Sequence, residues 1–109
     1  MPFNQALAAR IRTAIGRKKG INETKMFGGV GFLLNGNVLV GVWKDSMIVQ
    51  LGPKAGEDAL LERHVRVFDI TGKAVKGWVI VELEGVGLDE EVKGWVQKAV
   101  KFVGKMETK

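Results

Sequence analysis

Apolar positions recur every three or four residues near the two ends of the chain, which is the spacing of one helix face. This pattern predicts an amphipathic helix over residues 3–18, which the basic run 17–19 and Gly20 would end. It predicts a second helix over residues 88–104, whose first turn carries acids, as the helix dipole favours. The apolar positions are Phe3, Leu7, Ile11 and Ile15 in the first helix, and Leu88, Val92, Trp95, Val96, Ala99, Phe102, Val103 and Met106 in the second.

Between these helices the apolar period shortens to two, the period of a half-buried strand. Residues 24–51 are predicted to form three antiparallel strands, with a hairpin turn at residues 35–37 and a second turn at residues 44–46. A short helix is expected over about residues 53–62, and a further strand over residues 78–84, with Glu82 and Glu84 on one side. The sequence therefore predicts one α+β domain over residues 1–109. It would hold an antiparallel meander of about four to five strands, with the N- and C-terminal amphipathic helices packed on it.

Composition places the chain among soluble globular proteins, since 46% of its 109 residues are hydrophobic and 27% are charged. It has no cysteine, which excludes disulfides, thiolate metal sites and a cysteine nucleophile, and which suits a reducing cytoplasm. No apolar run approaches the roughly 20 residues of a membrane span, and the N-terminus lacks the pattern of a signal peptide. We therefore expect a cytoplasmic protein with no membrane role.

The net charge of +5 is unevenly distributed. Residues 1–25 hold six Lys or Arg against one acid, residues 26–92 six against ten, and residues 93–109 five against one. Basic ends that met in the fold would suit DNA or an acidic protein partner; the alternative is that both helices simply carry a solvated basic face. The candidate contacts are Arg10, Arg12, Arg17, Lys18, Lys19, Lys98, Lys101 and Lys105.

The segment Lys25-Met-Phe-Gly-Gly-Val-Gly-Phe-Leu-Leu-Asn-Gly-Asn37 is unusually rich in glycine. A phosphate loop needs Gly-x4-Gly-Lys-Ser/Thr, and no glycine here is followed by Lys-Ser/Thr. A dinucleotide fingerprint needs Gly-x-Gly-x-x-Gly between a strand and a helix, whereas Gly29-x-Gly31 is followed by Leu34 and a predicted hairpin. Glycines inside a strand usually mark a bulge, a bend or the close approach of another backbone. A structural role is therefore predicted.

Residues that could perform catalysis are few. Ser46 is the only serine, His64 the only histidine, and no histidine pair is present for a metal. Glu82 and Glu84 could form an acid–base pair, but solvated strand glutamates are far commoner. The sequence thus predicts no enzyme, no cofactor and no metal site.

The three tryptophans could be structural or could stack on a ligand. Trp95 lies on the apolar face of the last predicted helix and is expected in the core. Trp43 and Trp78 lie on predicted strands, and we expect them to be buried against a helix.

Read in order, several segments resemble the TfoX/Sxy N-terminal domain family. The resemblance covers about residues 24–104 and rests most on the Met-Phe-Gly-Gly and Lys-Gly-Trp-Val strings. Two departures are visible: Ala74 replaces the usual methionine, and the tail after residue 103 lacks the usual proline. The motif residues expected to be structural are Met26, Phe27, Gly28, Gly29, Gly31, Gly36, Gly77, Trp78 and Trp95. Further matches are Gly41-Val42, Asp45, Met47-Ile-Val49, Gly52-Pro53, His64-Val-Arg66, Asp69, Thr71-Gly72-Lys73, Lys76-Gly-Trp-Val79, Trp95-Val96 and Phe102.

The resemblance implies two helices packed on an antiparallel sheet, and no established catalytic residues or cofactor. It also implies a link to transcriptional control of natural competence, where full-length members act alongside the cyclic-AMP receptor protein. Those members carry a second, C-terminal domain, and we expect this chain to be a stand-alone member without it. The leading hypothesis is a non-enzymatic regulatory module that binds a macromolecule, either a protein of the transcription machinery, a regulator or DNA. The alternatives are a protein–protein or self-association domain such as a homodimer, and a small-ligand pocket between helix and sheet.

Overall fold

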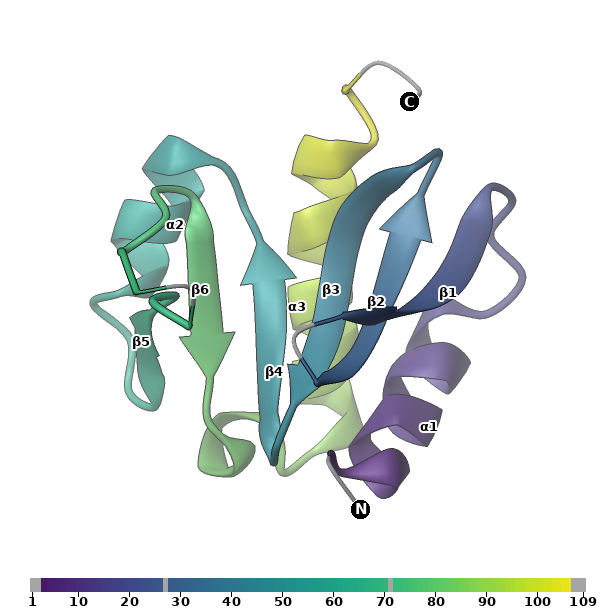
Figure 1. The fold of residues 1–109 in the computed structure, drawn as a ribbon, viewed down its shortest axis with the longest axis horizontal. Coiled ribbons are helices and arrows are strands. Elements are labelled where there is room, and N and C mark those ends of the chain that lie inside the picture. The colour runs from purple at the N-terminus through teal and green to yellow at the C-terminus, as the bar shows by residue number, and fades with distance from the viewer. Residues whose placement is uncertain (1–2, 27, 71, 107–109) are drawn as a thin grey trace.

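The computed structural model describes residues 3–26, 28–70 and 72–106. Over these residues the chain forms a six-stranded antiparallel sheet of order β1-β2-β3-β4-β6-β5, together with helices (Figure 1). The elements in chain order are α1 (Gln5–Ile15), β1 (Ile21–Met26), β2 (Gly29–Leu34), β3 (Asn37–Trp43), β4 (Ser46–Gln50), α2 (Pro53–Ala59), β5 (Val65–Val67), β6 (Trp78–Val81), the 3-10 helix η1 (Leu83–Val86) and α3 (Asp89–Val103).

The main core lies between one sheet face and the two terminal helices. In Figure 1, α1 and α3 lie behind the sheet, and α3 runs along β3 and β4. Alternate residues of the central strands point at these helices; Phe32, Val40 and Val49 are fully buried there. Ile11 of α1 and Val96 of α3 close the same core. The prediction of an α+β fold with both terminal helices on an antiparallel sheet is confirmed.

The first helix is shorter than residues 3–18. It begins after Asn4, whose side-chain oxygen accepts a hydrogen bond from the Leu7 N–H at 2.9 Å, and so satisfies one of the free amides of the first turn. It ends at Gly16, which takes a φ of +66°. Phe3 lies outside the helix and forms an isolated bridge with Lys44, while still packing against the core. The helix therefore stops before the basic run 17–19.

The other two α-helices also differ from prediction at their ends. Leu88 is 64% exposed and precedes α3, so it does not belong to the buried face. Its backbone N–H donates to the Glu91 side chain at 2.9 Å, which fixes the start of the helix. The helix α2 ends at Ala59 rather than near residue 62.

The sheet contains more strands than expected, because two of them lack a clear apolar pattern. The segment 24–51 was expected to hold three strands, but residues 21–50 form four, with the polar β1 as the first. The three-residue β5 is the other addition. The strand β6 ends at Val81, and η1 follows, so Glu82 and Glu84 do not share a strand face. The β2–β3 hairpin is confirmed, with φ of +53° at Asn35 and +85° at Gly36.

The glycines of β2 and β3 allow close approach within the sheet. A Cβ at Gly29 would collide with the carbonyl oxygen of Val42, and the space over Gly31 is filled by the side chain of Met26. Gly41 faces Gly31 in the register of these strands. Of the remaining motif residues, Gly28 lies in the β1–β2 turn, and Phe27 falls outside the described residues. The structural role predicted for the glycine-rich segment is confirmed at these positions.

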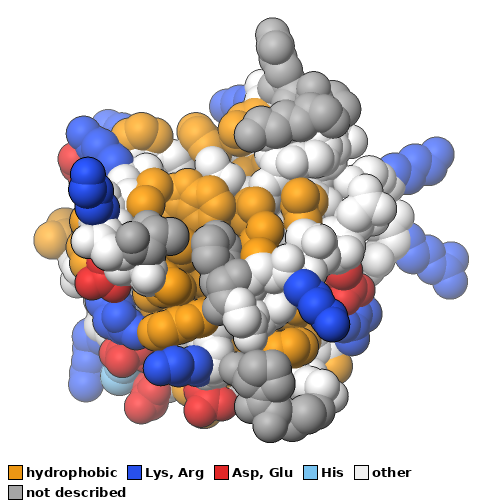
Figure 2. Space-filling model, in the orientation of Figure 1, with side chains coloured by type: hydrophobic (Ala, Val, Ile, Leu, Met, Phe, Trp, Pro, Cys, Tyr) orange, Lys and Arg blue, Asp and Glu red, His pale blue; other side chains and the backbone are white. Residues whose placement is uncertain are grey.

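A second, smaller apolar cluster covers the sheet face turned away from α1 and α3. Phe68, Ile48 and Ile80 form its buried centre, and Trp43 and Trp78 pack around it. The Phe68 and Trp78 rings lie 5.2 Å apart between centroids. Figure 2 shows apolar side chains gathered on this face over β6 and β4. The expectation that Trp43 and Trp78 are buried against a helix is therefore wrong, whereas Trp95 is in the helix-side core as predicted.

Among the described residues, none of the helices has the length and apolar character that crossing a membrane would require.

Candidate partner-binding groove

The last part of α3 and the start of α2 border a surface groove of about 610 Å³. Helix α3 buries Trp95, Ala99 and Val103 on one side, which leaves residues three and four positions apart on another side facing outward. Lys98 and Lys101 lie on that outward side, and Lys105 follows just past the helix end. All three line the groove.

Lys54 completes the basic rim from the opposite wall. It lies in the first turn of α2, directly after Pro53, and lines the groove with the three lysines of the α3 side. Asp58 is the one acid among the groove-lining residues. No motif in the sequence links Lys54 to residues 98–105, so sequence reasoning missed it. The rim carries four positive charges against one negative charge.

The floor of the groove is apolar. It is formed by Leu51, Gly52, Pro53 and the half-buried ring of Phe102. Gly52 has a φ of +89°, and a Cβ there would run into the Phe102 ring, so the ring rests directly on the backbone. An apolar side chain entering the groove would therefore meet an aromatic surface.

The predicted motif residue Gly77 fixes this floor in place. Its carbonyl oxygen accepts hydrogen bonds from the backbone N–H of Leu51 at 2.8 Å and of Gly52 at 3.1 Å. Gly77 has a φ of +91°, and its α-carbon also lies close to Gly56 of α2. The loop before β6 thus positions the start of α2 beneath the lysines.

The rim lysines differ in how far their charge is already balanced. Lys98 Nζ lies 3.6 Å from a carboxylate oxygen of Glu62 and 4.6 Å from the centroid of the Trp95 ring. Among the described residues, Lys54, Lys101 and Lys105 have no ion-pair partner within 4.0 Å. These three ammonium groups are available to an external anion without breaking an internal contact.

The basic residues of the N-terminal region do not join the groove. Arg10 Nε donates to Asp89 at 2.7 Å, which ties α1 to the start of α3. Arg12 binds both carboxylate oxygens of Glu23 in β1, at 2.7 and 2.8 Å. This hydrogen bonding, with the attraction of the two charges, lowers the pKa of Glu23 and raises that of Arg12. The other three candidates follow the helix as the exposed run 17–19. The eight candidate contacts thus divide into two groups, and only the α3 group borders the groove.

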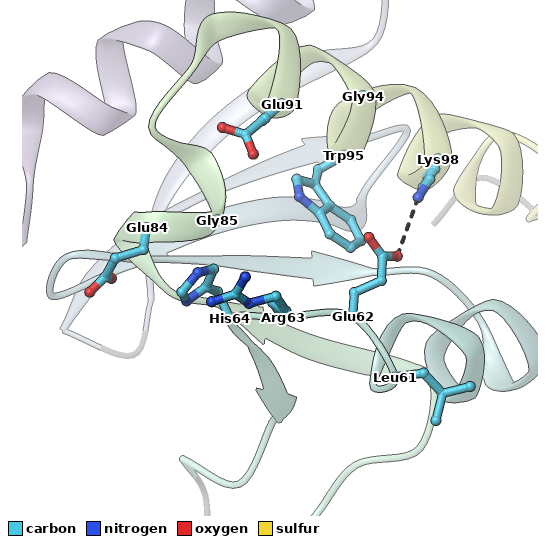
Figure 3. Close-up of a pocket in the computed structure, with 10 residues that line it drawn as sticks. All are labelled: Leu61, Glu62, Arg63, His64, Glu84, Gly85, Glu91, Gly94, Trp95 and Lys98. Atoms are coloured by element: carbon cyan, nitrogen blue, oxygen red, sulfur yellow. Dashed lines mark ion pairs between the residues drawn. The ribbon is translucent and has the colours of Figure 1, made fainter.

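A second hollow, of about 750 Å³, lies between η1, α3 and the segment that precedes β5 (Figure 3). Its titratable lining residues carry both signs, and in Figure 3 Glu62 points toward Lys98 while Glu84 points away from Glu91. His64, with a φ of +66°, is exposed at its edge. No hydrogen bond links His64 to these glutamates, and the described residues contain no group of three or more metal-type ligands. The hollow exceeds the roughly 300 Å³ of a small-ligand site, but its mixed charges do not single out one class of ligand.

The family model described as the TfoX N-terminal domain matches residues 14–103 of this chain. Comparison with curated proteins and with solved structures gave no match. The match spans the sheet, α2, α3 and both walls of the groove. The chain therefore belongs to the TfoX N-terminal domain family.

Proposed function

We propose that this member of the TfoX N-terminal domain family is a non-enzymatic regulatory module that binds an acidic segment of a protein partner. The partner would belong to the transcription machinery or be a regulator of it. The observation that carries this proposal is the set of unpaired lysines, Lys54, Lys101 and Lys105, around the exposed part of the Phe102 ring. The membership of a family of regulatory domains supports the same conclusion.

The shape of the groove favours a protein segment over duplex DNA. Phosphate contacts need accessible positive charge but no apolar recess, because the DNA backbone presents no apolar group to fill one. A peptide that carries a leucine or phenylalanine among glutamates satisfies both parts of the site: the apolar side chain covers Phe102, and the carboxylates meet the rim. Recognition of an amphipathic segment by an apolar groove with a charged border is a recurrent binding mode.

The internal ion pairs point the same way. Arg10 and Arg12 already bind Asp89 and Glu23, so a DNA phosphate would have to compete with a carboxylate at each of them. The groove lysines need no such exchange. Binding at the groove should weaken as salt rises, because exposed charges are screened.

The test is fluorescence anisotropy with a labelled synthetic peptide in which glutamates surround one leucine and one phenylalanine. The double variant Lys101→Glu/Lys105→Glu replaces two attractive contacts by repulsive ones. At 0.2–1 kcal/mol for each exposed pair made or opposed, its affinity should fall about tenfold or more. The matched control, Lys18→Glu/Lys19→Glu, makes the same change in net charge away from the groove and should bind almost as the wild type does.

Two further probes complete the test. A peptide with serine in place of leucine and phenylalanine should bind more weakly than the original, because the floor then gains no apolar contact. A labelled DNA duplex should bind no better than this serine peptide. Equal losses in both double variants, or tight binding of the duplex with none of the peptide, would overturn the proposal.

A further inference from the structure

The two edges of the sheet are protected unequally against pairing with another chain. The edge strand β5 has only three residues, a length that itself discourages further pairing. The other edge strand, β1, has six residues, contains no proline and pairs with β2 without a register shift. Residues 22–25 of β1 are all exposed. In Figure 1 this strand forms the right-hand edge of the sheet.

The backbone of β1 is hydrogen-bonded on one side only. Its six residues pair with β2, and the backbone hydrogen bonds outside helices and strands include none from residues 21–26. Within the described part of the chain, the outer N–H and C=O groups of this strand thus have no backbone partner. Such a row of groups is a template for an added strand.

We infer that β1 pairs antiparallel with β1 of a second copy of this chain, about a two-fold axis at Thr24. A two-fold axis perpendicular to the sheet requires that the residue on the axis faces its own copy. With Thr24 on the axis, Glu23 of each copy faces Lys25 of the other, on the same face of the sheet. Opposite charges at directly paired positions contribute about 0.2–1 kcal/mol each, and symmetry supplies two such pairs.

The neighbouring registers are disfavoured by the same rule. An axis at Glu23 places two carboxylates directly opposite one another, and an axis at Lys25 places two ammonium groups opposite one another, which destabilises the pairing. Lys25 has no ion-pair partner among the described residues, so the Thr24 register also supplies it with one. Glu23 is held at the edge by Arg12 and, as a carboxylate with several lone pairs, can accept from Lys25 as well.

This inference is independent of the proposed function. The groove is built from α2 and α3, and β1 lies at the far edge of the sheet from α2 (Figure 1). A dimer formed through β1 leaves both grooves open, so each hypothesis can fail without the other.

Charge reversal tests the register. Lys25→Glu alone and Glu23→Lys alone each create like-charge pairs across the axis and should remain monomeric. An equimolar mixture of the two variants restores opposite charges at both positions and should form a heterodimer. Sedimentation velocity over about 1 µM to about 1 mM covers the range expected of a small interface. The wild type should approach the dimer mass as concentration rises. A concentration-independent monomer mass for the wild type would overturn the inference.

Cysteine cross-linking tests the axis directly, because the natural chain has no cysteine. Thr24→Cys should form a disulfide-linked dimer under mild oxidation, since the two Cβ atoms of directly opposed residues lie about 4.5–5.5 Å apart. Asn22→Cys is the matched control on the same exposed strand; in this register it faces Met26 of the other copy and should not cross-link with itself. Equal cross-linking of the two variants, with their folding confirmed by circular dichroism, would refute the register.

Discussion

Replacement of Gly77 by alanine tests whether the loop before β6 positions the start of α2. Gly77 has a φ of +91°, and a Cβ there would lie 3.0 Å from the carbonyl carbon of Gly52 and 3.2 Å from the nitrogen of Pro53. These are backbone atoms, which cannot rotate away as a side chain can. The first turn of α2 would have to move by several tenths of an ångström, and the groove floor would move with it.

Gly72→Ala is the matched control. Gly72 has a similar φ of +96°, but a Cβ there would meet no atom within 4 Å. Both substitutions therefore impose the strain of a positive φ on an L-residue, about 1–2 kcal/mol. Only Gly77→Ala adds overpacking, which costs about 1–3 kcal/mol. The expected loss of unfolding free energy is about 1–2 kcal/mol for Gly72→Ala and about 2–5 kcal/mol for Gly77→Ala.

Urea and thermal unfolding, followed by tryptophan fluorescence, measure both variants. For a chain of this size, about 1 kcal/mol corresponds to about 4 °C in Tm, so Gly77→Ala should melt about 4–12 °C below Gly72→Ala. Peptide binding at the groove should weaken in Gly77→Ala and stay unchanged in Gly72→Ala under conditions where both are folded. Equal Tm values for the two variants would refute the assignment of close packing to Gly77.

Three further predictions concern stability. Arg12 holds the pKa of Glu23 below its usual range, so their pair stabilises the fold above the unfolded-state pKa of about 4.3 and is lost as pH falls through the lower folded-state pKa. Both side chains are more than a third exposed, so Glu23→Gln should cost at most about 1 kcal/mol at pH 7 and almost nothing near pH 2.5; urea unfolding showing the same loss at both pH values would contradict this. Leu39→Ala, at a fully buried position, should cost about 2–5 kcal/mol in urea unfolding, and Leu61→Ala, at an 88% exposed position, less than about 0.5 kcal/mol. Asn4→Ala removes the cap of α1 and should cost about 1 kcal/mol by the same measurement, whereas an unchanged midpoint would show that the cap contributes nothing.

The features that the sequence predicted well are encoded by residues close together in the chain. The two terminal helices follow from apolar residues repeated every three or four positions, and the β2–β3 hairpin from Asn35-Gly36, which accept positive φ. The structural role of Gly29 and Gly31 followed from their position inside a strand pattern. Each of these signals acts within a few residues, so it survives without knowledge of the rest of the fold.

The features that the sequence did not predict depend on partners distant in the chain. The strand β1 is polar on both faces, because at an edge its backbone pairs with β2 while its side chains stay in water. Backbone hydrogen bonds leave no side-chain pattern, so neither β1 nor the short β5 was recognised as a separate strand. Trp43 and Trp78 lie on alternating strands, yet the sheet face they occupy became clear only once Phe68 was seen to cover it.

The sequence by itself determined the fold class, the ends at which the helices lie and the family to which the chain belongs. Tertiary structure alone decided the candidate site. Lys54 and Lys101 come from different helices and meet because Gly77 holds the start of α2 beside α3. Arg10 and Arg12, with the same charge and an equal claim from sequence, bind acids elsewhere in the chain. Net charge counts these side chains alike, whereas their availability to a partner depends on which acids the fold brings within reach.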